Sequence, residues 1–166
     1  MRLFTGLIIF SAMAFANADK DWAALEKMKG EWVGDGKGKP GDSTGSFTFL
    51  PDLQGKVYIR KNRADYPATK DRPAFTHEDL MTVYRDGDII RADYFDNEGH
   101  VIRYIVTASA DQTGVIFVSS PEPKAPRYRL RYNFGEPGRM KLAFDMAAPG
   151  KPDQFQNYVE ASLRRK

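Results

Sequence analysis

The chain has 166 residues, a formal net charge of +3 and no cysteine. The absence of cysteine excludes disulfides, thiolate metal ligands, a cysteine nucleophile and a lipid-modified N-terminal cysteine. The near-balanced charge gives no reason to expect nucleic-acid binding.

The first 18 residues have the order of a secretory signal peptide. Arg2 precedes an apolar run from Leu3 to Phe15, and the small-residue cleavage site Ala16-Asn17-Ala18 follows it. The run is shorter than the ~20 residues that a transmembrane helix requires. We therefore expect cleavage of residues 1–18, a bacterial protein of the periplasm or secreted from the cell, and no membrane span in the mature chain. Residues 19–166 are expected to form one domain.

One helix is predicted, directly after the cleavage site. Trp22, Leu25 and Met28 recur at helical spacing, and Gly30 ends the pattern. After Gly30 the sequence changes to short runs of aromatic and β-branched residues that are separated by Gly, Pro, Asn and Asp. This texture is typical of an all-β domain.

Ten strands are predicted in this part of the chain. They lie near residues 31–36, 44–50, 55–63, 77–85, 88–96, 100–107, 114–119, 126–134, 139–147 and 154–164. Several of the connections are short and contain residues that tolerate positive φ, so consecutive strands are expected to pair as hairpins. The stretch 65–75, with two prolines, is expected to be the one long loop.

The clearest alternation is in the eighth predicted strand. Tyr128, Leu130, Tyr132 and Phe134 fall on one face, and arginines and an asparagine fall on the other. A meander of strands that each have one apolar face buries those faces best by curling into a closed sheet. We predict a single antiparallel up-and-down β-barrel of about ten strands, with the helix closing one end. A two-sheet sandwich is the alternative.

The segment after the helix reads Gly30-x-Trp32-x-Gly34-x-Gly36. It resembles the opening of the calycin barrels, which include the lipocalins and the fatty-acid-binding proteins. The resemblance implies that Trp32 closes the base of the barrel and that a basic side chain from a late strand covers its ring. Arg164 and Arg165 are the candidates for this cation–π contact.

A closer likeness runs along most of the mature chain. It is carried by Leu53-x-Gly55-Lys56-Val57-Tyr58, Tyr94-Phe95-Asp96-Asn97-Glu98-Gly99-His100, Val118-Ser119, Arg127-Tyr128-Arg129-Leu130 and Ala148-Pro149-Gly150-Lys151-Pro152. These segments resemble a family of exported bacterial lipocalin-like proteins with no assigned activity. The resemblance supports the fold and leaves the function open.

The nitrobindin-type heme barrels share the Gly-x-Trp-x-Gly opening and a ten-strand barrel, and they bind iron through a histidine near the C-terminus. The histidines of this chain are His77 and His100, and neither lies near the C-terminus. The resemblance therefore fails at the iron ligand, and heme is disfavoured. We expect no cofactor and no metal.

The leading functional hypothesis is a binding protein that holds a small apolar or amphipathic molecule inside the barrel. Aromatic and aliphatic side chains on several predicted strands are candidates for the lining, although some of them must instead fill the seam between helix and barrel. The candidates are Phe47, Phe49, Tyr58, Leu80, Tyr84, Tyr94, Tyr104 and Phe117.

The alternative is an enzyme, a hydrolase or isomerase at the barrel mouth. Alternate residues of a strand share a face, so His77 should lie beside Asp79, and His77 could act with Asp79 or Glu78. The other interpretation is that these are polar residues at the start of a strand. Asp96-x-Glu98-x-His100 falls across a predicted turn, and we interpret it as turn-forming.

Arg129 and Arg131 are candidates for binding a carboxylate or a phosphate, provided that they point inward. The apolar residues of the same strand are expected to occupy its core face, which favours an outward orientation of the two arginines. A third class of function is an envelope interaction protein with a filled barrel and an apolar patch outside. The sequence indicates no oligomeric state.

Overall fold

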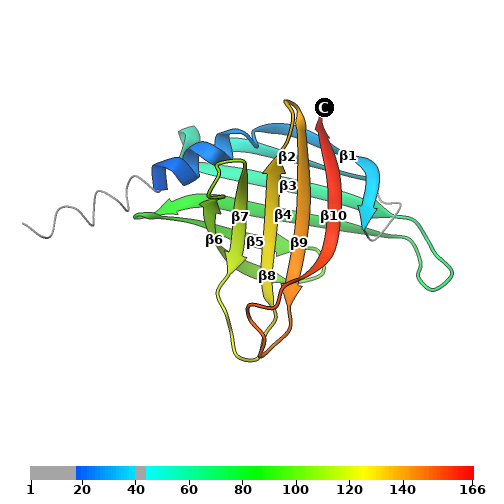
Figure 1. Cartoon of the computed structure of the whole chain (residues 1–166). Helices are drawn as coiled ribbons and strands as arrows, with labels where there is room; N and C mark the ends of the chain where they lie inside the picture. Colours follow the sequence, from blue (N-terminus) through cyan, green and yellow to red (C-terminus); the bar gives the residue numbers. More distant parts are fainter. Residues whose placement is uncertain (1–17, 40–43) are drawn as a thin grey trace, which may run out of the picture.

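The computed structural model describes residues 18–39 and 44–166 (Figure 1). The predicted signal peptide falls almost entirely outside these residues. In the described part of the chain, none of the helical segments has the length and apolarity needed to cross a membrane.

The described residues form a short helix at 18–26 and ten strands. The strands are β1 (Gly30–Lys39), β2 (Thr44–Asp52), β3 (Val57–Tyr66), β4 (Phe75–Asp86), β5 (Ile89–Asp96), β6 (Val101–Ala108), β7 (Gly114–Ser119), β8 (Arg127–Phe134), β9 (Arg139–Ala147) and β10 (Gln156–Arg165). A single 3-10 turn, η1 (Leu53–Gly55), connects β2 to β3.

Every strand pairs with its sequence neighbour, and β1 pairs with β10 to close the sheet. All ten pairs are antiparallel. The predicted up-and-down barrel is confirmed, and the sandwich alternative is wrong. Closure leaves no unpaired edge strand.

The barrel wall follows the two-residue period of the sequence. In β6, Ile102, Tyr104 and Val106 are buried, whereas the residues between them are exposed. Each strand therefore contributes one apolar row to a shared interior.

The helix lies across one end of the barrel (Figure 1). Its side chains pack against buried aromatic residues there. Leu25 and Met28 are fully buried. The Trp22 ring lies 5.0 Å from that of Tyr58, which stacks on Phe49 at 4.8 Å. These contacts fill the half of the barrel nearest the helix.

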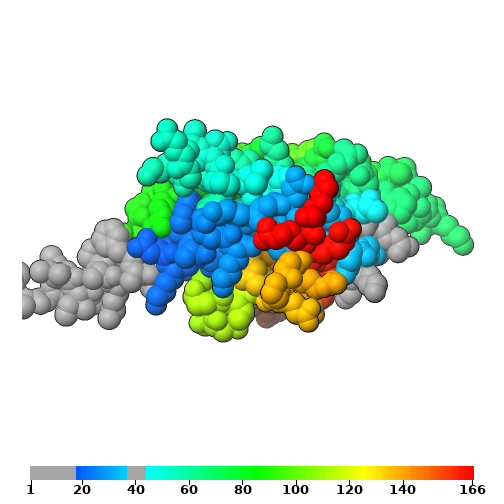
Figure 2. Space-filling view, turned by 90° about the horizontal axis from the view of Figure 1, so that it is seen from above, coloured from blue at the N-terminus to red at the C-terminus, as the bar shows by residue number. Residues whose placement is uncertain are grey.

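The Trp32 side chain is 3% exposed and its Nε1 donates a hydrogen bond of 2.7 Å to the Met28 carbonyl. The Arg165 guanidinium lies 4.7 Å from the centre of the Trp32 ring and donates to the Lys29 carbonyl. Figure 2 shows the N-terminal and C-terminal segments, blue and red, meeting on this face. Trp32 lies buried at this end of the barrel, as the resemblance implied, and Arg165 is the candidate that covers its ring. Both Arg164 and Arg165 are exposed to solvent.

Gly30 is required for this arrangement. Its φ of +119° lies outside the range that residues with a side chain favour, and a β-carbon at this position would lie 2.6 Å from Arg165 Nη1. The structural role predicted for Gly30 thus follows from the backbone turn into β1 and from the space that Arg165 occupies.

Arg165→Ala is expected to lower the free energy of unfolding by about 0.5 to 2 kcal/mol, because the variant loses the cation–π contact with Trp32. Urea denaturation measures the change. Arg164→Ala is the matched control and should unfold close to the wild-type midpoint. Equal effects of the two variants would contradict the assignment of Arg165.

Candidate functional site

The other half of the barrel is hollow. A cavity of about 440 Å³ is lined by residues of nine strands and by the turn at 97–100 between β5 and β6. The helix contacts the opposite end of β6, where Asp21 accepts a hydrogen bond of 2.7 Å from the Ala108 amide. The cavity therefore lies toward the barrel end away from the helix.

The cavity has two chemically different walls. The polar wall comes from β3, β4 and β5 and includes Arg60, Asn62, His77, Asp79 and Tyr94. The mainly apolar wall comes from β8, β9 and β10. It includes Leu130, Leu142, Phe144, Ala161 and Leu163, together with one charged residue, Glu160. A molecule inside would have a polar and an apolar face presented to it at once.

Three of the predicted lining residues, Phe47, Tyr94 and Tyr104, do line the cavity. Phe49, Tyr58 and Phe117 are buried in the packed half, as expected for residues at the seam with the helix.

The prediction is wrong for Leu80 and Tyr84. The inward residues of β4 are Asp79, Met81 and Val83, so the even-numbered positions face outward. Leu80 is 36% exposed, and the Tyr84 hydroxyl donates to Asp93 on β5.

The inward orientation proposed for Arg129 and Arg131 is also wrong. Both side chains lie on the outer face and donate to Asp145 at 2.9 and 2.8 Å. Asp145 is 1% exposed because the two guanidinium groups and Asn157 cover it. Burial would raise the pKa of Asp145, but the hydrogen bonds from Arg131, Arg129 and Asn157 outweigh it and hold the pKa below its usual value. The arginines thus stabilise the outer wall.

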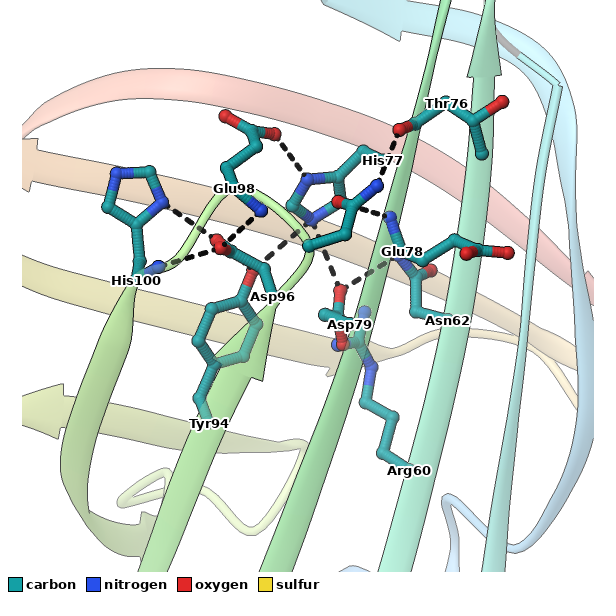
Figure 3. Close-up of polar contacts among 11 residues, drawn as sticks. Arg60, Asn62, Thr76, His77, Glu78, Asp79, Tyr94, Asp96, Glu98 and His100 are labelled. Carbon is teal, nitrogen blue, oxygen red and sulfur yellow. Dashed lines mark hydrogen bonds and ion pairs between the residues drawn. The ribbon is translucent and has the colours of Figure 1, made fainter.

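His77 faces the cavity, as the enzyme hypothesis required. Its Nδ1 lies 2.8 Å from Glu98 Oε1, and its Nε2 lies 3.3 Å from Asp79 Oδ2 and 3.1 Å from the Tyr94 hydroxyl (Figure 3). Glu78 does not belong to this group: it lies on the outer face, where it pairs with Arg63 at 2.8 Å. The predicted partnership of His77 with Glu78 is therefore wrong.

The centre of the polar wall is an ion pair between Arg60 and Asp79, which are both buried. Asp79 also accepts a hydrogen bond of 2.9 Å from Asn62. The Arg60 guanidinium lies 5.2 Å above the Phe47 ring. The period of two from the core residue Tyr58 places Arg60 and Asn62 on the inner face of β3.

The turn at 97–100 is organised by Asp96. Its carboxylate accepts bonds from the Glu98 amide at 3.0 Å and the His100 amide at 2.8 Å, and it lies 2.9 Å from His100 Nδ1. Burial would raise the pKa of Asp96, but these bonds, chiefly those from His100, lower it. The turn-forming interpretation is confirmed, and the same residues also line the cavity.

The hydrogen bond with Asp79 raises the pKa of His77 to about 9, against the opposing effect of burial and with further help from Glu98. His77 is consequently an imidazolium at neutral pH and can donate hydrogen bonds or a proton. A general base must be unprotonated, so this environment opposes a role for His77 as a base at neutral pH. Burial, followed by the charges of Asp79 and Asp96, raises the pKa of Tyr94, which stays a neutral phenol.

His77 should make the stability of the protein pH-dependent. Its folded-state pKa is raised above the ordinary value of 6.5, so its contribution is complete below about pH 6.5 and is lost as the pH rises through about 9. We expect the free energy of unfolding of the wild type to fall by about 1 to 3 kcal/mol more than that of His77→Gln between pH 6 and pH 9.5. Urea titrations of both proteins at the two pH values measure this difference. Parallel pH profiles would contradict the ion-pair network.

Two buried polar atoms have no hydrogen-bond partner within residues 18–39 and 44–166: Arg60 Nε and the Tyr132 hydroxyl. In the same part of the chain, no group of three or more histidine and carboxylate side chains is placed to hold a metal ion.

Comparison with known proteins gives a likeness in structure. No protein-family model and no curated protein matches the chain. The crystal structure of Rv2717c from M. tuberculosis is similar to it, with a TM-score of 0.62 and 15% sequence identity over 88% of this chain and 97% of that chain. The fold of this chain is a closed ten-stranded antiparallel barrel. At this level of identity the likeness concerns the fold alone.

Proposed function

We propose that this protein binds a small amphipathic molecule inside the barrel. The observation that carries the proposal is the cavity of about 440 Å³ with one polar and one apolar wall. Ligand sites are commonly clefts of roughly 300 to 1,000 Å³ that are mostly apolar and have a few placed polar groups. The apolar part of the ligand would lie against β8 to β10, and its polar part would face β3 to β5.

The polar wall is organised before any ligand binds, which favours binding. Asp79 is held by Arg60, Asn62 and His77, and His77 is held by Glu98. A ligand would not have to order these side chains, so the entropy cost of binding is reduced.

The signal-like N-terminus supports export, so we propose that binding takes place in the periplasm or outside the cell. Native mass spectrometry of the protein purified from the periplasmic fraction tests both parts. The expected result is a mature chain that begins at Asp19 and carries extra mass from a small molecule. Reproducible recovery of the ligand-free full-length chain would contradict the proposal.

A defined probe tests whether the cavity itself binds. Leu142 lies on the apolar wall, and Lys141 is its exposed neighbour on the same strand. We expect N-phenyl-1-naphthylamine to fluoresce on binding, and Leu142→Trp to weaken its affinity by about tenfold or more, because the larger side chain occupies the cavity. Lys141→Trp should bind like the wild type. If Leu142→Trp and Lys141→Trp bound N-phenyl-1-naphthylamine with equal affinity, the probe would bind outside the cavity.

A further inference from the structure

We propose that the polar end of the ligand is an uncharged oxygen acceptor, a carbonyl or hydroxyl oxygen, and that it binds to the Nε–H of Arg60. This inference rests on the proposed function and names the chemistry of the ligand. Arg60 is 4% exposed and lines the cavity. It lies against Phe47, at the boundary between the hollow half and the packed half of the barrel.

The first step of the argument is a donor that lacks an acceptor. Nη1 of Arg60 is bonded to Asp79, whereas its Nε has no partner among the described residues. The guanidinium is planar and its donors are fixed relative to one another, so Nε cannot turn toward another acceptor without breaking the bond to Asp79. A buried N–H without an acceptor is unfavourable, and an oxygen atom supplied from the cavity would satisfy it.

A second buried group without a hydrogen-bond partner is close enough to Arg60 to be affected by its positive charge. The Tyr132 hydroxyl is fully buried and has no partner among the described residues. Burial raises the pKa of Tyr132 to about 12, and the positive charge of Arg60 counteracts part of this effect. Tyr132 therefore remains a neutral hydroxyl in the core behind the cavity lining, so Arg60 Nε is the donor for a ligand oxygen in the cavity.

The charge of the lining argues against an anionic ligand. With His77 protonated, the cavity carries three positive groups, Arg60, Arg72 and His77, against four carboxylates, Asp79, Asp96, Glu98 and Glu160. A carboxylate brought to Arg60 would lose its hydration without gaining an excess of positive charge, because Asp79 already neutralises Arg60. A cation cannot accept the Nε–H bond.

The test is a matched series of ten-carbon ligands at pH 7.5, each measured by displacement of N-phenyl-1-naphthylamine. We expect 2-decanone and 1-decanol to bind the wild type about tenfold or more tightly than decanoate. Tighter binding of decanoate would overturn the inference, and this comparison needs no variant to fold. If the probe and all three ligands fail to bind, the proposed function itself is wrong.

Arg60→Lys locates the contact, because lysine keeps a positive charge opposite Asp79 but lacks the Nε–H of the guanidinium plane. We expect it to weaken 2-decanone about tenfold, with the affinity of the probe measured separately in the same variant so that the displacement can be converted. Arg63→Lys, on the outer face of the same strand, is the matched control and should leave both affinities unchanged. An unaltered affinity of Arg60→Lys for 2-decanone would mean that water, rather than the ligand, satisfies Nε, and would overturn the inference.

Discussion

Trp32→Ala should lower the free energy of unfolding by about 3 to 5 kcal/mol, which is the usual cost of removing a buried tryptophan and leaving a cavity. Trp32 is buried between the helix and the barrel. Its indole Nε1 donates a hydrogen bond to the Met28 carbonyl, and its ring makes a cation–π contact with Arg165. Because a domain of this size is stabilised by roughly 5 to 15 kcal/mol, the loss should be visible as a large drop in the urea midpoint.

Two further measurements distinguish the specific role of Trp32 in closing the barrel from the general loss of stability that removal of a buried aromatic ring causes. Trp32→Phe keeps most of the buried area but leaves the Met28 carbonyl without its donor, so an intermediate midpoint is expected. In Trp32→Ala, the additional change Arg165→Ala should cost less than it does in the wild type, since the ring it covers is gone. A Trp32→Ala variant that unfolds at the wild-type midpoint would refute this view of how the barrel is closed.

Asp79→Leu should be comparably destabilising, by about 3 to 5 kcal/mol, because it leaves the buried Arg60 charge without a partner. The double variant Arg60→Met, Asp79→Leu should recover much of this loss, since two apolar side chains of similar size remove both buried charges. Urea denaturation of the two single variants and the double variant gives the coupling energy of the pair.

The neighbouring residue supplies the control. Glu78 also pairs with an arginine, Arg63, but both side chains are about half exposed. Surface ion pairs contribute roughly 0 to 1 kcal/mol, so Glu78→Leu should have a small effect. If the two carboxylates proved equally costly to remove, burial would not be what makes the Arg60 pair important.

The barrel could be predicted because its strands keep a strict period of two and are joined mostly by short turns. The predicted loop at 65–75 is the main error in the strands. There β3 and β4 extend to Tyr66 and Phe75, whose rings stack at 4.5 Å beneath Arg72. A cross-strand pair of this kind depends on the register of two strands, which the local sequence does not reveal.

The site was predicted less completely, for two physical reasons. Strand β4 has apolar residues on both faces, so alternation alone could not decide whether Leu80 or Met81 points inward, and a shift by one residue reverses every side chain. His77 and Asp79 share a strand and were found by their spacing. Arg60 reaches them from β3 and Glu98 from the turn between β5 and β6, so that only the folded barrel brings the four together.

The division of the interior into a packed half and a hollow half separates the residues that maintain the fold from those that contact a ligand. Substitutions on the apolar wall, at Leu142 or Ala161 for example, alter the shape of the cavity, and both of these side chains are only partly buried. Ligand preference can therefore diverge between related chains while Trp32, Leu25 and Met28 keep the same barrel closed. Such a scaffold is well suited to evolving new binding specificities, and libraries for directed evolution should be confined to β8, β9 and β10.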